Sequence, residues 1–86
     1  MKLVKFTQSV CQPCKILEMM LGSMGAEVDE SRLLDSQEAL DEANDKFGVM
    51  STPTIILFDD AGTELSRTVG IHPPSIQQIL IAGGKL

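Results

Sequence analysis

Apolar and polar positions in the first part of the chain predict a strand followed by a helix. The apolar run over residues 1–7 is typical of a buried strand. A helix is expected to begin around residues 11–13, because proline is tolerated in a first helical turn, where its missing N–H would have no partner. Apolar side chains then recur at helical spacing as far as Met24 and give this helix one apolar face.

Residues 28–34 and 35–47 are expected to form a second strand and a second helix. The strand would be anchored by its apolar residues, which are Val28, Leu33 and Leu34. Asp35 is predicted to be the N-cap of the helix, with Glu38 three residues later completing a capping box. Gly48 follows the last apolar position of this segment and is expected to end the helix.

The second half of the chain predicts a hairpin and a last helix. The β-rich run Pro53–Phe58 leads into Asp59–Gly62, whose residues are typical of a turn. Glu64–Val69 alternates apolar or long side chains with polar neighbours and is predicted to pair back on the preceding strand. A final helix is expected to open at Pro73.

The predicted order is therefore β-α-β-α-β-β-α, which indicates a protein of the α/β class. The first three elements form a crossover unit, which favours a parallel pair of strands, and the later hairpin adds antiparallel strands. We expect one mixed four-stranded sheet flanked by helices on both faces. At 86 residues, we expect residues 1–86 to form a single domain.

The charge of the chain narrows the range of partners. Seven Lys and Arg residues stand against twelve Asp and Glu residues, a formal net charge of −5. This balance argues against binding to nucleic acids and to anionic membranes, both of which need basic surface. The longest apolar stretch, Val49–Phe58, is too short to span a bilayer, and the N-terminus lacks the pattern of a signal peptide. We therefore expect a cytoplasmic monomer.

Cys11 and Cys14 carry the one strong chemical motif. Two cysteines three residues apart at a helix start lie close enough to form a disulfide. The helix N-terminus stabilises a thiolate, so the pKa of Cys11 is expected to be lowered and Cys11 to attack a substrate disulfide. Cys14, one turn further, would then resolve the mixed disulfide. Lys15 adds a positive charge nearby, unless its side chain simply points into water.

Other readings of the cysteine pair remain open. A structural zinc site needs four ligands, and the chain has no further cysteine and only one histidine, His72. Within one chain we therefore expect no metal site and no cofactor. Two chains could still share a metal ion or an iron–sulfur cluster through four cysteines, and an inert buried thiol pair is a further alternative.

Three segments of the chain resemble the thioredoxin-like superfamily. Cys11-Gln12-Pro13-Cys14 after an apolar strand is similar to the thioredoxin active site, and Phe47–Phe58 is similar to the segment that contains the family's cis-proline. Val69-Gly70-Ile71 resembles the glycine loop beside that site. The resemblance implies a thioredoxin-like fold and a dithiol oxidoreductase that reduces protein disulfides.

The same resemblance implies a substrate groove beside the cysteines. It implies that Pro53 is cis and packs against the disulfide, and that the backbone of Thr52 binds an extended substrate in the manner of an added strand. The residues expected to line the groove are Val10, Gln12, Pro13, Thr52, Pro53 and Gly70.

The chain also departs from the family pattern. Thioredoxins usually carry tryptophan before the first cysteine and a buried aspartate six residues before it, and these positions are Val10 and Lys5 here. An ammonium group close to the cysteines would lower the thiol pKa values, although Lys5 could equally point outward at the sheet edge or extend its buried stem so that the ammonium reaches the surface. We retain both interpretations.

The electron source is predicted from what the chain lacks. In length it resembles glutaredoxins and the small glutaredoxin-like donors of ribonucleotide reductase. The segment from Gly70 to Pro74 has no basic cluster that would hold the carboxylates of glutathione. A thioredoxin-reductase-type flavoenzyme is therefore the favoured partner, with ribonucleotide reductase as a candidate substrate and a glutathione-coupled enzyme as the alternative.

Overall fold

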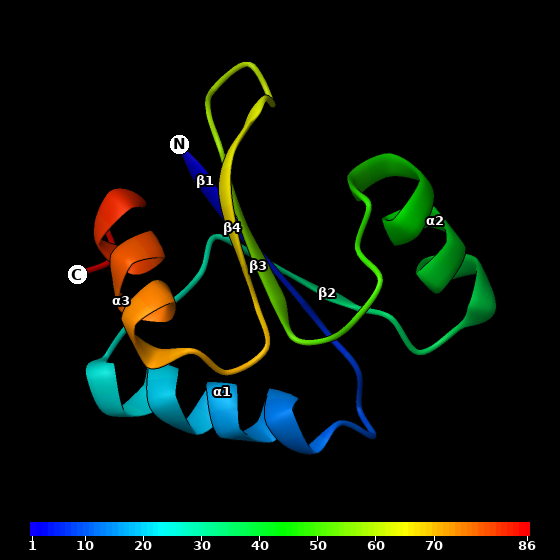
Figure 1. The fold of residues 1–86 in the computed structure, drawn as a ribbon, viewed down its shortest axis with the longest axis horizontal. Helices are drawn as coiled ribbons and strands as arrows, with labels where there is room; N and C mark the ends of the chain where they lie inside the picture. Colours follow the sequence, from blue (N-terminus) through cyan, green and yellow to red (C-terminus); the bar gives the residue numbers. More distant parts are fainter.

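The computed structural model describes residues 1–86 and contains four strands and three helices (Figure 1). In chain order they are β1 (Lys2–Thr7), α1 (Gln12–Met24), β2 (Glu30–Leu33), α2 (Gln37–Phe47), β3 (Thr54–Phe58), β4 (Glu64–Val69) and α3 (Pro73–Ala82). The strands form one sheet in the order β2-β1-β3-β4, in which only β1 and β2 are parallel. The predicted order of elements and the mixed four-stranded sheet are confirmed.

The sheet separates two apolar cores because successive side chains of a strand point to opposite faces. On one face, Leu3 of β1 and Leu57 of β3 pack with α1 and α3. On the other face, Val4 and Phe6 of β1 pack with the apolar side of α2. Figure 1 shows α1 and α3 on one side of the strands and α2 on the other. None of the three helices combines the length and the apolar character needed to cross a bilayer.

The predicted N-cap of α2 is wrong by one residue. Ser36, not Asp35, caps the helix, and its hydroxyl accepts a hydrogen bond from the backbone N–H of Ala39. Asp35 is engaged elsewhere, because its carboxylate accepts hydrogen bonds from the backbone N–H and the hydroxyl of Ser9. The C-terminal end of α2 is as predicted, with Gly48 in the left-handed region at φ 64°.

One expectation about the edge strands needs correction. Leu33 was expected to anchor β2, but 57% of the residue is exposed, while the next residue, Leu34, is buried. In β4 the apolar residues Leu65 and Val69 are about half exposed, and the buried position is Thr68. Both strands lie at an edge of the sheet, and the order of apolar and polar residues alone did not identify their buried side.

Candidate active site

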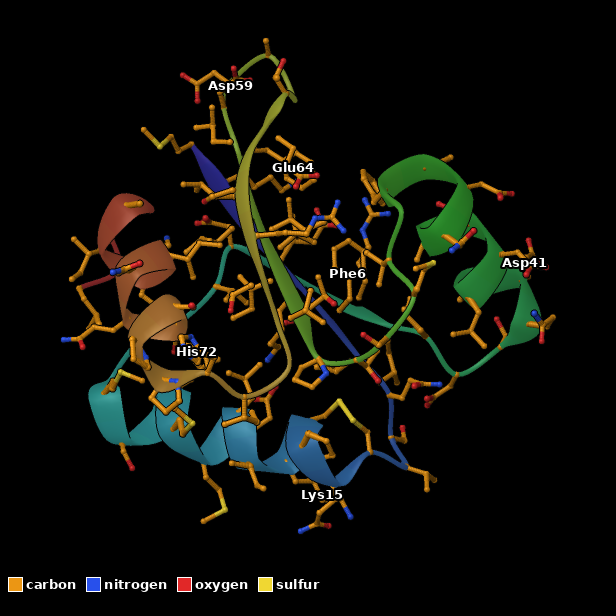
Figure 2. All side chains as sticks on the ribbon, viewed as in Figure 1. Phe6, Lys15, Asp41, Asp59, Glu64 and His72 are labelled. Carbon is orange, nitrogen blue, oxygen red and sulfur yellow. A yellow bond between two sulfur atoms is a disulfide. The ribbon has the colours of Figure 1, made fainter.

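The end of β1 and the start of α1 place the two cysteines at the tip of a helix. Cys11 is the N-cap residue with extended backbone angles, and its Sγ accepts a hydrogen bond from the backbone N–H of Cys14 at 3.2 Å. Pro13 occupies the first turn, where a missing N–H costs nothing. A disulfide joins Cys11 and Cys14, as the yellow bond at the N-terminal end of α1 shows (Figure 2).

The two sulfur-bearing residues differ in their access to solvent. Cys14 is buried beneath the first turn of α1, with only 3% of the residue exposed. Cys11 is partly exposed at the end of the helix. An incoming sulfur atom can therefore reach Cys11 more readily than Cys14.

A loop before β3 brings Thr52 against Cys11 and contains Pro53. The Thr52–Pro53 peptide bond is cis, and Pro53 is buried. Cys11 Sγ lies 3.5 Å from the hydroxyl oxygen of Thr52 and 3.8 Å from its carbonyl oxygen. The carbonyl of Pro53 accepts a hydrogen bond from the N–H of Gly70 at 2.9 Å, which joins the Gly70 loop to the same region. The Thr52 segment thus meets the disulfide, and the Gly70 loop is joined to that segment through Pro53.

Exposed apolar side chains flank this meeting point. Val10 precedes the first cysteine and is 96% exposed, and Met50 in the loop before Pro53 is 85% exposed. Gln12 is also exposed at the start of α1. Thr52 makes no backbone–backbone hydrogen bond, so its N–H and C=O have no strand partner within the chain. This combination offers apolar contact and a backbone segment without backbone hydrogen bonds to another chain.

Hydrogen bonds hold the loop between β1 and α1 from two directions. The hydroxyl of Thr52 donates to the side-chain carbonyl of Gln8 at 2.8 Å. The carboxylate of Asp35 receives the hydroxyl and the N–H of Ser9, and these two hydrogen bonds hold the pKa of Asp35 below its usual range. The sequence analysis singled out neither Gln8 nor Ser9, because their partners lie 44 and 26 residues away.

Lys5 lies on the face of β1 that α1 covers. Its side chain is only 8% exposed, and its ammonium group forms an ion pair with Glu18 of α1, whose side chain is 54% exposed. Glu18 is four residues after Cys14 and so lies on the same face of the helix. Lys5 does not point outward at a sheet edge, because β1 is an inner strand, but its buried stem carries the ammonium to the half-exposed Glu18. Glu18 was not among the residues singled out from the sequence.

Two other charged or titratable residues lie away from this arrangement. Figure 2 shows Lys15 leaving α1 on the side opposite to the disulfide. His72 lies at the N-cap position of α3, and its Nδ1 is 2.5 Å from the hydroxyl oxygen of Ser75. No group of three or more His, Cys, Asp or Glu side chains in the chain is arranged to hold a metal ion.

The comparisons with known proteins agree with this geometry. Residues 2–83 match the family model described as a thioredoxin-like domain. The SPbeta prophage-derived thioredoxin-like protein YosR of Bacillus subtilis is 31% identical over 80 residues, which cover 93% of this chain and 95% of that protein. A thioredoxin of Chlamydia muridarum is 40% identical over 70 residues, covering 80% of this chain and 68% of the relative. The crystal structure of a thioredoxin from Nicotiana alata superposes with a TM-score of 0.71 at 30% identity, covering 95% and 73% of the two chains.

Proposed function

The chain belongs to the thioredoxin-like family and is a thiol–disulfide oxidoreductase, and we propose that it reduces disulfides in other proteins, with Cys11 attacking and Cys14 resolving. The observation that carries these roles is the unequal access of the two sulfurs at the start of α1. Cys11 is reachable at the helix N-terminus, whereas Cys14 is buried one turn behind it.

The proposed exchange balances in two steps. The Cys11 thiolate attacks one sulfur of the target disulfide, forms a mixed disulfide and releases the other target sulfur as a thiolate. Cys14 loses its proton and attacks Cys11 Sγ, which forms the Cys11–Cys14 disulfide and releases the second target sulfur. Two electrons pass to the target, which is reduced, and the dithiol of this protein is oxidised. The unpaired N–H groups at the start of α1 favour the thiolate that begins the sequence.

We propose that the target binds along the Thr52 segment as an extended chain. The N–H and C=O of Thr52 make no backbone hydrogen bond within the chain and are available for strand-like hydrogen bonds, and the exposed Val10 and Met50 supply apolar contact. The remaining residues of the proposed groove are Gln12, Pro13, Pro53 and Gly70.

We also propose that Lys5 modulates the thiols. The Lys5 side chain is buried on the face of β1 that α1 covers, and the partner of its ammonium, Glu18, lies one helical turn after Cys14. A buried cation favours the thiolate over the thiol, and the carboxylate of Glu18 opposes that effect. Lys15 has no such placement, so the modulation is assigned to Lys5 alone.

The trapping experiment tests the assignment of the two cysteines. A Cys14→Ser variant cannot resolve the mixed disulfide, so a protein disulfide substrate such as insulin should remain attached to Cys11, as peptide mass spectrometry would show. The matched Cys11→Ser variant should trap nothing. If Cys14 in the Cys11→Ser variant captured the substrate equally well, the two roles would be wrong.

The electron source is proposed to be a thioredoxin-reductase-type flavoenzyme in a reducing compartment such as the cytoplasm, and ribonucleotide reductase is a candidate substrate. Two coupled assays of NADPH consumption decide the electron source. One contains thioredoxin reductase, and the other contains glutathione and glutathione reductase. Turnover only in the second assay would select the glutaredoxin-type alternative. A coloured or zinc-containing dimer after anaerobic purification would instead select a carrier that shares a metal between two chains.

A further inference from the structure

The hydroxyl of Thr52 stands between two acceptors and has one hydrogen to give. Its oxygen lies 2.8 Å from the side-chain carbonyl of Gln8, to which it donates, and 3.5 Å from Cys11 Sγ. The Cys11 sulfur already receives the backbone N–H of Cys14 at 3.2 Å. The direction of this one O–H bond therefore decides whether Cys11 has a second hydrogen-bond donor.

The better acceptor changes with the oxidation state of the cysteines. A disulfide sulfur is a weak acceptor, so in the oxidised protein the amide carbonyl of Gln8 holds the hydrogen. Reduction releases Cys11 as a thiolate, and a hydrogen bond to a charged acceptor is stronger than one to a neutral carbonyl. A hydroxyl hydrogen turns about a single bond, so the exchange of partners requires no movement of the backbone.

We propose that Gln8 is a positioning residue that sets the redox equilibrium by competing with the Cys11 thiolate for the Thr52 hydroxyl. The hydrogen bond from the Thr52 hydroxyl to the Gln8 carbonyl is present in the oxidised protein and is broken in the reduced one. It therefore stabilises the disulfide relative to the dithiol and makes this protein a stronger reductant. The inference rests on the proposed function only in taking Cys11 as the sulfur that ionises.

The test is the equilibrium of the protein with glutathione, in which two glutathione molecules and the protein disulfide give oxidised glutathione and the protein dithiol. Gln8→Met keeps the length of the side chain and removes the carbonyl. Loss of one neutral hydrogen bond should shift the equilibrium about 2- to 12-fold towards the dithiol. For a two-electron couple this shift raises the reduction potential by about 10–30 mV. The thiolate absorbance at 240 nm should appear at lower pH in the same variant.

A double-mutant cycle separates this role from a general effect on the loop. In a Thr52→Val background there is no hydroxyl to compete for, so Gln8→Met should change neither the equilibrium nor the thiolate titration. Ser9→Ala removes the hydroxyl contact to Asp35 in the same loop and should leave both readouts at wild-type values.

The outcomes distinguish the inference from the proposed function. A wild-type protein that does not exchange with glutathione or with any dithiol would overturn the proposed function. The inference alone would be overturned if the wild type exchanges normally but Gln8→Met does not shift the equilibrium with glutathione, or shifts it towards the disulfide. A shift of equal size in the Thr52→Val background would also overturn the inference alone. A reversed sign would mean that the Gln8 amide donates to Thr52 instead of accepting from it.

Discussion

Removing either charge of the Lys5–Glu18 pair should have opposite consequences for stability. The Lys5 side chain is 8% exposed and that of Glu18 is 54% exposed. In Glu18→Gln the ammonium stays buried without a counter-charge, whereas in Lys5→Met an apolar side chain of similar length fills the same space and Glu18 can turn to water. We therefore expect Glu18→Gln to be the more damaging change.

The burial of the two partners sets the magnitude. Breaking a fully buried pair costs about 3–5 kcal/mol, and an exposed pair contributes about 0.2–1 kcal/mol. With one partner buried and the other half exposed, screening by water reduces the upper figure, and we expect Glu18→Gln to lower the unfolding free energy by about 1–2 kcal/mol. Lys5→Met should lie between no change and a gain of about 2 kcal/mol.

The assay is urea denaturation of the oxidised protein at pH 7, with an unchanged slope required for each variant. In the Lys5→Met background, Glu18→Gln should change stability by less than about 0.5 kcal/mol, since its partner is gone. The thiolate fraction at pH 7 of the reduced variants should rise in Glu18→Gln and fall in Lys5→Met. A Lys5→Met variant that is less stable than Glu18→Gln would refute the reasoning. It would mean that the Lys5 ammonium stabilises the fold through interactions other than its ion pair with Glu18.

Three further changes test other parts of the structure. Gly83→Ala should lower the unfolding free energy by about 1–3 kcal/mol in a melting experiment, because the new Cβ would lie 2.5 Å from the Leu3 Cδ1 atom in the core. Asp29→Asn should weaken the loss of unfolding free energy at acid pH, measured by denaturation at a series of pH values. Hydrogen bonds from the Leu3 N–H and then from Lys85 hold the pKa of Asp29 below its usual value, so the stability that Asp29 contributes is present above pH 4 and is lost as pH falls through that lowered pKa. Met50→Gln should lower kcat/KM for a protein disulfide about 3- to 10-fold and leave reduction of a small aromatic disulfide unchanged, since only the larger substrate would cover this exposed side chain.

The elements that could be predicted are those whose signals are local. The apolar face of α1, the left-handed glycine after α2 and the β3–β4 hairpin all depend on residues within a few positions of one another. The cysteine pair at the start of α1 was identified for the same reason. The meeting of Cys11 with Thr52 spans 41 residues, and only the resemblance to the thioredoxin-like family made that contact predictable.

The features that could not be predicted depend on partners supplied by the tertiary fold. Asp35 looks like an N-cap in the sequence, but Ser9 occupies its carboxylate and Ser36 takes the capping position. The hydrogen bond of Gln8 depends on the loop before β3, which places the Thr52 hydroxyl beside it. The partner of Lys5 could not be predicted either, because nothing in the sequence spacing of Lys5 and Glu18 indicates that α1 places Glu18 beside Lys5.

Competitive alkylation of the reduced protein tests most directly whether the two sulfurs have unequal roles. A brief exposure to substoichiometric iodoacetamide at pH 7, followed by peptide mass spectrometry, measures which sulfur reacts first. We predict that the label is found on Cys11 and that Cys14, buried in the first turn of α1, stays unmodified until Cys11 is consumed. Equal labelling of both cysteines, or preferential labelling of Cys14, would contradict the account.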